Sequence, residues 1–193
     1  MLYVEGIKMN NIEDADVKIS RAVYEQLVLT AAKQEIFELS ATYMRALDRL
    51  DAELMKSVYH PDATFEIGIY SGDGDGFTAF AMEALGPHER NHHMLGQANI
   101  DVEGDVAFGE IYFQAFHRVH EEGGDQDFVV LGRYVDRYEK RGGAWKMTHR
   151  TELFDFSQEL PASDHWLSSS PEVPRGFRGS NDLSSQRDKV RVL

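Results

Sequence analysis

The sequence of 193 residues contains no cysteine. Disulfide bridges, thiolate metal sites and thiol nucleophiles are therefore excluded, and a cytoplasmic location is expected. Long apolar runs are also lacking, because each apolar stretch is short and interrupted by charge, so no membrane-spanning helix is expected. The first twenty residues lack a basic segment followed by an apolar core, which argues against a secretory signal.

Positive charge is scarce as well, since 20 Lys and Arg face 33 Asp and Glu and the net charge is −13. Nucleic-acid binding depends largely on neutralising phosphates, so a nucleic-acid partner is not expected. The densest basic segment, residues 133–146, is itself diluted by Asp136 and Glu139. The charge balance therefore favours solubility and indicates nothing more about partners.

The apolar share of 42% and the charged share of 27% are typical of a globular chain. We expect an N-terminal arm over residues 1–18 and one α+β domain over residues 19–156. Residues 157–193 are rich in Ser, Pro, Gly and charge. Such a composition indicates an extended tail that either docks onto another surface or remains disordered.

Helical periodicity dominates the first part of the domain. Ser20 is expected to cap a short helix that ends near Ala32. The clearest helix follows over residues 34–50, where apolar side chains recur on one face at Ile36, Leu39, Tyr43, Leu47 and Leu50. Asp51 is expected to cap a further short helix.

Strand patterns dominate the remainder. A first strand is expected within residues 60–69, then a glycine-rich loop over residues 71–76 and a short helix over residues 77–86. Four long runs rich in aromatic and β-branched residues follow, at 92–102, 105–119, 127–140 and 144–156. Short glycine-containing turns separate them and predict antiparallel hairpins. The pattern predicts an α+β fold in which a strongly curved antiparallel sheet is closed by N-terminal helices around an apolar pocket.

Four polar residues are candidates for chemistry. Asp48 falls at the edge of the apolar arc of the long helix, although a solvated position near a helix end is the simpler interpretation. His92 and His93 open a strand, so only one of them can face the pocket. Arg150 is either an exposed arginine or a buried one that pairs with a carboxylate or with an anionic substrate group. No HxH or HExxH spacing is present, so we expect no metal site, and the acidic segment 73–76 is interpreted as a turn rather than a calcium loop.

Three segments, residues 43–66, 92–119 and 132–150, carry a resemblance to a known family. Together they resemble the SnoaL-like branch of the nuclear-transport-factor-2-like superfamily, which has a cone-shaped cystatin-like fold and includes scytalone dehydratase, hexachlorocyclohexane dehydrochlorinase and bile acid 7α-dehydratase. The resemblance covers roughly residues 34–155. It implies an Asp–His pair formed by Asp48 and His93, with Gln97 in place of the usual asparagine.

The resemblance also implies that Tyr43 and Arg150 take part in catalysis, Tyr43 by donating a hydrogen bond where negative charge develops. Such a set fits a cofactor-free lyase or isomerase that removes a proton from a small cyclic or aromatic substrate. The expected activities are dehydration, dehydrohalogenation or isomerisation. The substrate is expected to contact a hydrophobic lining formed by Phe37, Met44, Phe65, Tyr112, Phe116 and His117.

Two further functions remain open. The first is a non-catalytic small subunit of a complex of the ring-hydroxylating dioxygenase type. The second is a small-molecule binding module without turnover. An aromatic-rich sheet needs a cover on its outer face, so a homo-oligomer, either a dimer or a trimer, is expected. We expect a small hydrophobic molecule as partner, and neither a membrane nor nucleic acid.

Overall fold

The computed structural model describes residues 19–186 and residue 189; the N-terminal arm expected over residues 1–18 lies outside this part. The helices are α1 (Arg21–Arg49), α2 (Ala52–Ser57), α3 (Gly74–Leu85) and α4 (His165–Ser168). The strands are β1 (Tyr59–Glu66), β2 (Ser71–Asp73), β3 (Arg90–Glu103), β4 (Val106–Val119), β5 (Gln126–Arg141) and β6 (Ala144–Pro161). Two short 3-10 helices, Gly179–Asn181 and Leu183–Ser185, follow α4.

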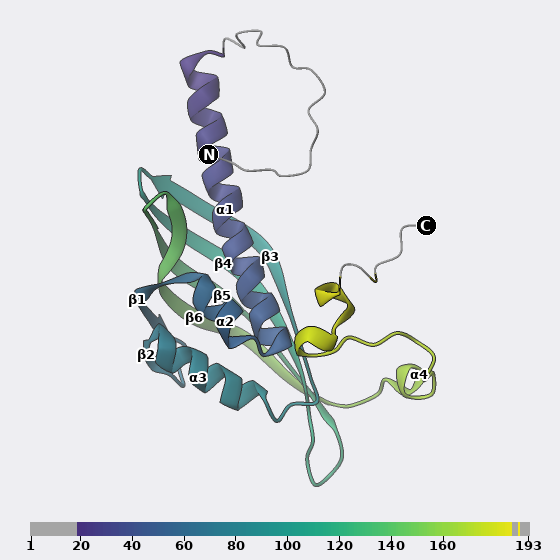
Figure 1. Cartoon of the computed structure of the whole chain (residues 1–193). Helices are drawn as coiled ribbons and strands as arrows, with labels where there is room; N and C mark the ends of the chain where they lie inside the picture. The colour runs from purple at the N-terminus through teal and green to yellow at the C-terminus, as the bar shows by residue number, and fades with distance from the viewer. Residues whose placement is uncertain (1–18, 187–188, 190–193) are drawn as a thin grey trace.

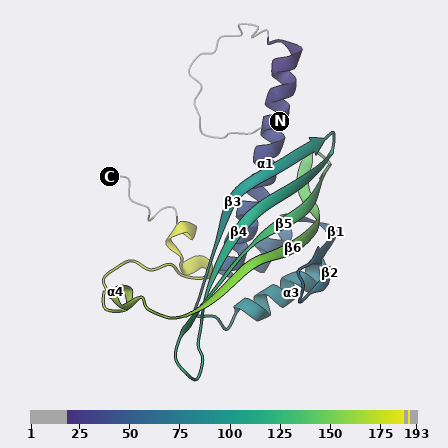
Figure 2. The ribbon, with the colours of Figure 1, turned by 180° about the vertical axis from the view of Figure 1, so that it is seen from behind.

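The six strands form one sheet in the order β2-β1-β6-β5-β4-β3. Helices α1, α2 and α3 lie on one face of this long, twisted sheet, and the view from behind shows the other face uncovered by helices (Figures 1 and 2). The α+β fold with a strongly curved sheet and N-terminal helices is thus confirmed. The sheet remains open, with β2 and β3 at its two edges.

The sheet is not wholly antiparallel, which corrects one expectation. Strands β3 to β6 form the expected antiparallel meander, but β1 pairs with β6 in parallel. Parallel neighbours require a long connection, and here α3 and the strands β2 to β5 supply it. The meander therefore begins with β3 at one edge of the sheet and ends with β6 beside β1.

The two helices expected before residue 50 are one helix, α1, of 29 residues. Ser20 caps its start by accepting a hydrogen bond from the backbone N–H of Val23. Neither glycine nor proline interrupts the chain between Ala32 and Gln34, so nothing in the sequence breaks the helix there. It ends at Leu50, which adopts a left-handed conformation with φ of 51°. The expected cap at Asp51 is confirmed, since its side chain accepts from the N–H of Leu54.

The glycine-rich segment 71–76 is not a loop. Its first half is the short strand β2 and its second half is the first turn of α3. Asp73 caps this helix by accepting a hydrogen bond at 2.8 Å from the backbone N–H of Gly76. An aspartate at a helix start satisfies an otherwise free N–H, and this effect outweighs the low helix propensity of the glycines.

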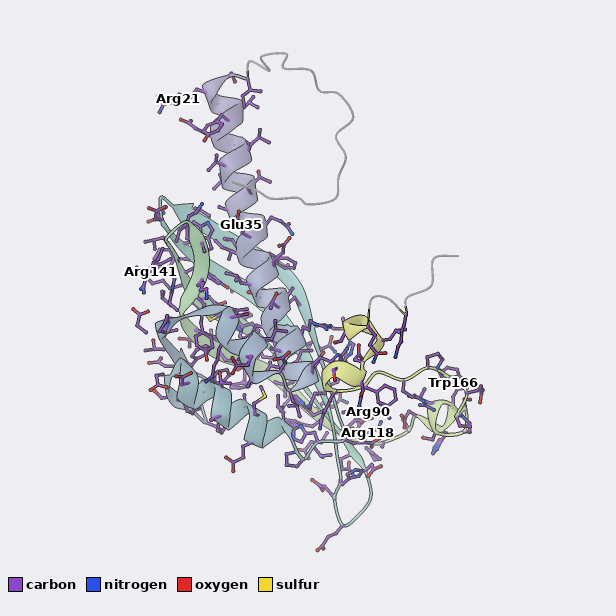
Figure 3. The ribbon with its side chains drawn as sticks, in the orientation of Figure 1. Arg21, Glu35, Arg90, Arg118, Arg141 and Trp166 are labelled. Carbon is purple, nitrogen blue, oxygen red and sulfur yellow. The ribbon has the colours of Figure 1, made fainter. Side chains whose placement is uncertain are left out.

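Strand β6 continues to Pro161, so the domain boundary expected at residue 156 falls within a strand. The following segment returns to its own domain (Figure 3). Arg118 on β4 donates to Asp127 and, at 3.0 Å, to Asp164 just before α4. Further along, Arg178 donates to the carbonyl oxygens that follow α3, including that of Gly86 at 3.0 Å. Among the described residues, no helix is both long enough and apolar enough to cross a membrane.

Candidate active site

Asp48 and His93 meet at the junction of α1 and β3. The Nδ1 atom of His93 lies 2.7 Å from Oδ1 of Asp48, and the backbone N–H of His93 donates to the same oxygen at 3.0 Å. The side chain of Asp48 is 11% exposed and that of His93 is 6% exposed. The last turn of α1 therefore holds a carboxylate against the inner face of the sheet, where β3 supplies both a backbone and a side-chain donor.

These contacts fix the position of the imidazole proton. An ionised carboxylate only accepts hydrogen bonds, so Nδ1 of His93 carries a proton and donates a hydrogen bond to Asp48. The lone pair of the neutral ring is then on Nε2. The carboxylate also stabilises the imidazolium that forms when Nε2 takes up a proton. The contact thus holds the imidazole in one tautomer and leaves Nε2 free of the carboxylate.

His92, the neighbour of His93, is exposed and lies on the opposite face of β3. Its ring is 6.4 Å from that of Phe116, between centroids, on the outer side of the sheet. The alternation of side chains along a strand imposes this difference. His93 is thus the histidine that faces the interior.

A cavity of about 190 Å³ lies between the helices and the inner face of the sheet. An apolar cavity of roughly 150 Å³ is large enough to hold benzene, so this one has room for a molecule with one ring. Most of its lining is apolar, and the polar groups are Tyr43, His93, His117, Tyr134 and Glu152. The apolar lining is formed by Leu47, Ile67, Ile69, Phe77, Phe80, Ala81, Ala84, Leu85, Phe113, Ala115, Phe128, Val130 and Phe154.

Tyr43 lies in the cavity wall as expected, and its side chain is buried. Its ring stacks on Phe77 at 6.1 Å and meets Tyr134 edge-on at 5.8 Å, between centroids. Burial raises the pKa of the Tyr43 hydroxyl well above its usual value of 10. The hydroxyl therefore stays protonated at neutral pH and is available as a hydrogen-bond donor.

Arg150 is completely buried and does not line the cavity. Its Nε and Nη2 atoms donate to Asp136 at 2.8 and 2.7 Å, and its guanidinium lies between the rings of Tyr43 and Tyr134, 4.1 and 3.8 Å from their centroids. Burial acts to lower the pKa of Arg150, but the charge of Asp136 and its hydrogen bonds hold it well above its usual value. Of the two partners considered for a buried Arg150, a carboxylate and an anionic substrate group, the structure shows the carboxylate, that of Asp136.

Of the six side chains expected to line the pocket, His117 does so and the other five do not. Tyr112 and Phe116 are on the outer face of β4, because the inward positions are Phe113, Ala115 and His117. A strand alternates its faces, so the neighbours Phe116 and His117 point to opposite sides, and Tyr112 points to the same side as Phe116.

The remaining three residues lie elsewhere for reasons of packing. Met44 and Phe65 are buried within the core, where Phe65 stacks on Phe77 at 4.3 Å and Met44 receives a contact from the Tyr134 hydroxyl. Phe37 borders a separate surface groove beside Ala98 on β3. Apolar periodicity identifies a buried helix face but does not distinguish core from cavity wall.

Two polar side chains that we did not identify from the sequence, Asn91 and His88, lie beside His117. Asn91 is buried, and its Oδ1 atom lies 2.9 Å from Nδ1 of both His88 and His117. Its Nδ2 atom donates to the carbonyl of Leu85. Burial, followed by the nearby His93 and His88, lowers the pKa of His117 to about 3. His117 is therefore neutral at pH 7, with its proton on Nδ1.

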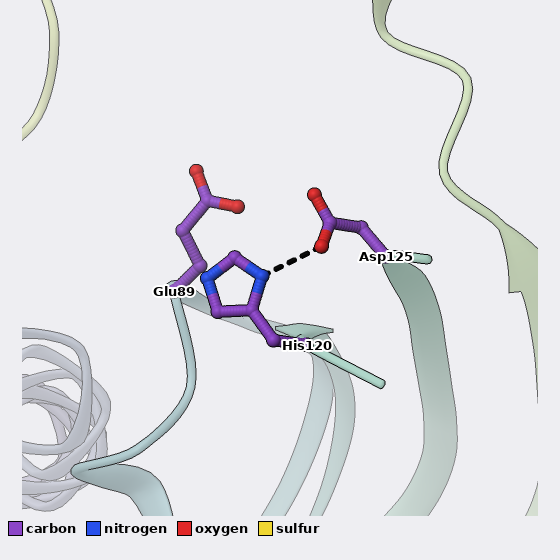
Figure 4. Close-up of side chains that lie close together, drawn as sticks. All are labelled: Glu89, His120 and Asp125. Atoms are coloured by element: carbon purple, nitrogen blue, oxygen red, sulfur yellow. Dashed lines mark hydrogen bonds and ion pairs between the residues drawn. The ribbon is translucent and has the colours of Figure 1, made fainter. Parts of the chain in front are cut away.

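The described residues include one group with the composition of a metal site, formed by Glu89, His120 and Asp125 (Figure 4). Their ligand atoms lie within 4.8 Å of one another, but all three side chains are exposed. Nδ1 of His120 is 2.6 Å from Asp125, so a hydrogen bond accounts for their proximity. None of the three lines the cavity.

A curved open sheet that encloses a cavity against N-terminal helices defines the nuclear-transport-factor-2-like fold, and solved structures agree. Hexachlorocyclohexane dehydrochlorinase LinA-type3 from Novosphingobium barchaimii is 17% identical, with a TM-score of 0.61 over 73% of this chain and 96% of that one. A protein proposed to be a scytalone dehydratase, from Novosphingobium aromaticivorans, is 19% identical with a TM-score of 0.58, over 74% and 93%. A superfamily protein from Salmonella enterica is 22% identical, also at 0.58, over 70% and 95%.

Sequence comparison specifies the family. Residues 29–151, more than half of the chain, match the SnoaL-like domain. The chain therefore belongs to the SnoaL-like domain family. No curated protein matches the sequence.

Proposed function

We propose that the protein is a cofactor-free lyase or isomerase that removes a proton from carbon in a small, one-ring hydrophobic substrate. The observation that carries the proposal is the contact of 2.7 Å between Asp48 and Nδ1 of His93, which leaves Nε2 as a base in a wall of the cavity. A general base in such a position accelerates proton transfer by roughly 10²- to 10⁴-fold. Asp48 stabilises the imidazolium, and Tyr43 donates a hydrogen bond to the oxygen on which negative charge develops.

The likeness to a dehydrochlorinase structure and to a protein proposed to be a dehydratase supports this class of reaction. Both names describe loss of a small group from a carbon next to a removable proton. The buried ion pair of Arg150 and Asp136 has a structural role, because the guanidinium of Arg150 packs against the rings of Tyr43 and Tyr134. Arg150 thus acts on the cavity through Tyr43.

Exchange with deuterium tests proton removal before the natural substrate is identified. Cyclohexanone and related cyclic ketones in D₂O exchange their α-hydrogens when a base removes them, and mass spectrometry measures the rate. We expect the wild-type protein to accelerate exchange and His93→Ala to lower the rate by about 100-fold or more. His92→Ala, on the opposite face of the same strand, is the matched control and should retain the wild-type rate.

Asp48→Asn should lower the exchange rate as well, because the neutral amide no longer stabilises the imidazolium. If His93→Ala exchanges cyclic ketones as fast as the wild type, His93 is not the base. A ligand that stabilises the wild-type protein yet shows no exchange would instead indicate a binding module without turnover.

We also infer that a second copy of the chain covers the outer face of the sheet. Met94, Tyr112, Leu131 and Phe156 line an apolar groove of about 370 Å³ on that face, and Phe156 is 55% exposed. Apolar groups gathered in this way on a folded domain are typical of an interface. The partner is thus another copy, while the cytoplasmic location stays a prediction.

A further inference from the structure

Glu152 is the single carboxylate among the described residues that line the cavity. It lies on β6 opposite Tyr134 of β5, two positions after the buried Arg150 and two before the exposed Phe154. Its side chain is half-buried. The carboxyl group therefore belongs to the cavity wall, between a buried position and an exposed position of β6.

Within the described part of the chain, Glu152 has no hydrogen-bond or ion-pair partner. The nearest strong cation, Arg150, is already committed to Asp136 by two hydrogen bonds. The other titratable groups that face the same cavity are Tyr43, Tyr134, His93 and His117. A half-buried carboxyl group in such surroundings is either protonated or ready to contact a ligand.

The surroundings favour the protonated form. Burial raises the pKa of Glu152 to about 7, with Arg150 acting to lower it and Asp136 to raise it. At neutral pH a large share of the molecules therefore has a carboxylic acid in the cavity, which donates a hydrogen bond that a carboxylate cannot. Tyr43 and Tyr134 are kept neutral by burial and do not compete for this proton.

Glu152 and His93 reach the cavity from opposite sides. Two strands, β4 and β5, separate β6 from β3, which corresponds to roughly 14 Å between backbones along a flat sheet at the usual strand spacing. The curvature of the sheet shortens this span, and both side chains point into the same cavity. A single ring placed between them would contact the base with one side and the acid with the other.

Building on the proposed function, we propose that Glu152 is the general acid of the site and that the substrates are β-hydroxy carbonyl compounds that lose water. Nε2 of His93 takes the proton from the carbon next to the carbonyl, and the C–H electron pair forms the new C=C bond. The C–O bond breaks, and the leaving oxygen takes the proton of Glu152 and departs as water. The imidazolium then returns its proton through solvent to the carboxylate of Glu152.

The acid identifies the leaving group. Hydroxide is a strong base and leaves slowly unless a proton is delivered to it, whereas halide or acetate is a weak base that needs none. A site that only expelled halide would gain nothing from a protonated carboxyl group. The presence of Glu152 thus favours dehydration over dehydrohalogenation.

Infrared spectroscopy tests the acid without turnover. We expect the wild-type protein to show a protonated carboxyl band that titrates near pH 7, and Glu152→Gln to lack it. Glu159→Gln, an exposed glutamate on the same strand, is the matched control. A missing band, or tighter binding of cyclohexylamine than of cyclohexanone, would show an ionised Glu152 and overturn the proposal.

Elimination distinguishes this inference from the proposed function. With 3-hydroxycyclohexanone, Glu152→Gln should form cyclohexenone about 100-fold more slowly than the wild type, and with 3-acetoxycyclohexanone no more than about threefold more slowly. His93→Ala should be slow with both. An equal effect of Glu152→Gln on both compounds, or no effect, rules out Glu152 as the acid and leaves His93 in place. Fast elimination by His93→Ala refutes the proposed function itself. If neither compound reacts, the infrared band of the protonated carboxyl group decides whether Glu152 is an acid in the cavity.

Discussion

At the scale of single residues, the cavity separates ionisable groups by environment. His93 is tied to a carboxylate, while His117, with a ring centroid only 5.2 Å away, is tied to the neutral amide of Asn91. The two imidazoles therefore have different partners although they share a wall. One imidazole therefore has a carboxylate partner, while the other has a neutral partner and is itself neutral at pH 7.

The neutral state of His117 makes stability dependent on pH. Its pKa is lowered from 6.5 to about 3 in the folded protein, so between these values the unfolded chain binds the extra proton. The free energy of unfolding therefore falls as pH decreases from 6.5 towards 3. Between pH 7 and pH 4 this group should remove about 3 kcal/mol of stability.

Urea denaturation of His117→Gln at the two pH values measures this term, because glutamine retains a donor for Asn91 but does not titrate. The variant should lose about 3 kcal/mol less than the wild type between pH 7 and pH 4. Equal losses in both proteins would show that His117 titrates normally in the folded state.

At the scale of elements, the curvature of the sheet depends on local irregularities. The register between β5 and β6 shifts between Leu131 and Gly132, so that Leu131 opposes Phe156 while Gly132 opposes Phe154. Such a bulge bends the strands and increases their twist. It lies beside Phe113 and Phe154, which both line the cavity.

Gly132 is required at this bulge because the backbones approach closely. A Cβ atom added to Gly132 would lie 2.1 Å from the carbonyl oxygen of Leu153 and 2.8 Å from the ring of Phe113. Gly132→Ala should therefore reduce the free energy of unfolding by about 3 kcal/mol or more. Gly123→Ala, where no atom lies within 4 Å, is the control and should change it by less than about 0.5 kcal/mol. Urea denaturation measures the free energy of unfolding of both variants. Equal values would mean that β5 and β6 can accommodate the added Cβ atom without loss of stability.

At the scale of the whole molecule, the two faces of the sheet differ in what covers them. Helices cover its inner face and leave its outer face uncovered (Figure 2). The cavity lies on the inner face, and an exposed apolar groove lies on the outer face. Burying this groove against another copy would remove apolar surface from water. The proposed interface therefore lies behind the cavity wall formed by β4 and β5.

Sedimentation equilibrium tests this interface. The wild-type protein should sediment as an oligomer, and Phe156→Glu should be a monomer because it places a charge within the apolar groove. Trp166→Glu, at an exposed aromatic position on α4, should remain an oligomer. A monomeric wild type, or an oligomeric Phe156→Glu, would contradict the proposal.

Much of the fold is local in origin and follows from the sequence. Apolar periodicity predicts the helical part of residues 34–50, and glycine turns predict the meander. The caps at Ser20 and Asp51 are also local, since each satisfies a nearby backbone N–H. The parallel pairing of β1 with β6 is different, because it joins segments separated by five elements.

The Asp48 and His93 positions were identified through the resemblance to a family, whereas the cavity lining was not predicted correctly. Which face of β4 points inward depends on register and bulges, and these are set by contacts between distant strands. Glu152 has no distinguishing signal in its own segment, because its role depends on burial beside Arg150 and Asp136. The sequence by itself determined the elements and their order, since turns, caps and periodicity act over a few residues. The tertiary structure alone decided which side chains share the cavity and which carboxyl group has a raised pKa, because desolvation arises only when the curved sheet packs against the helices.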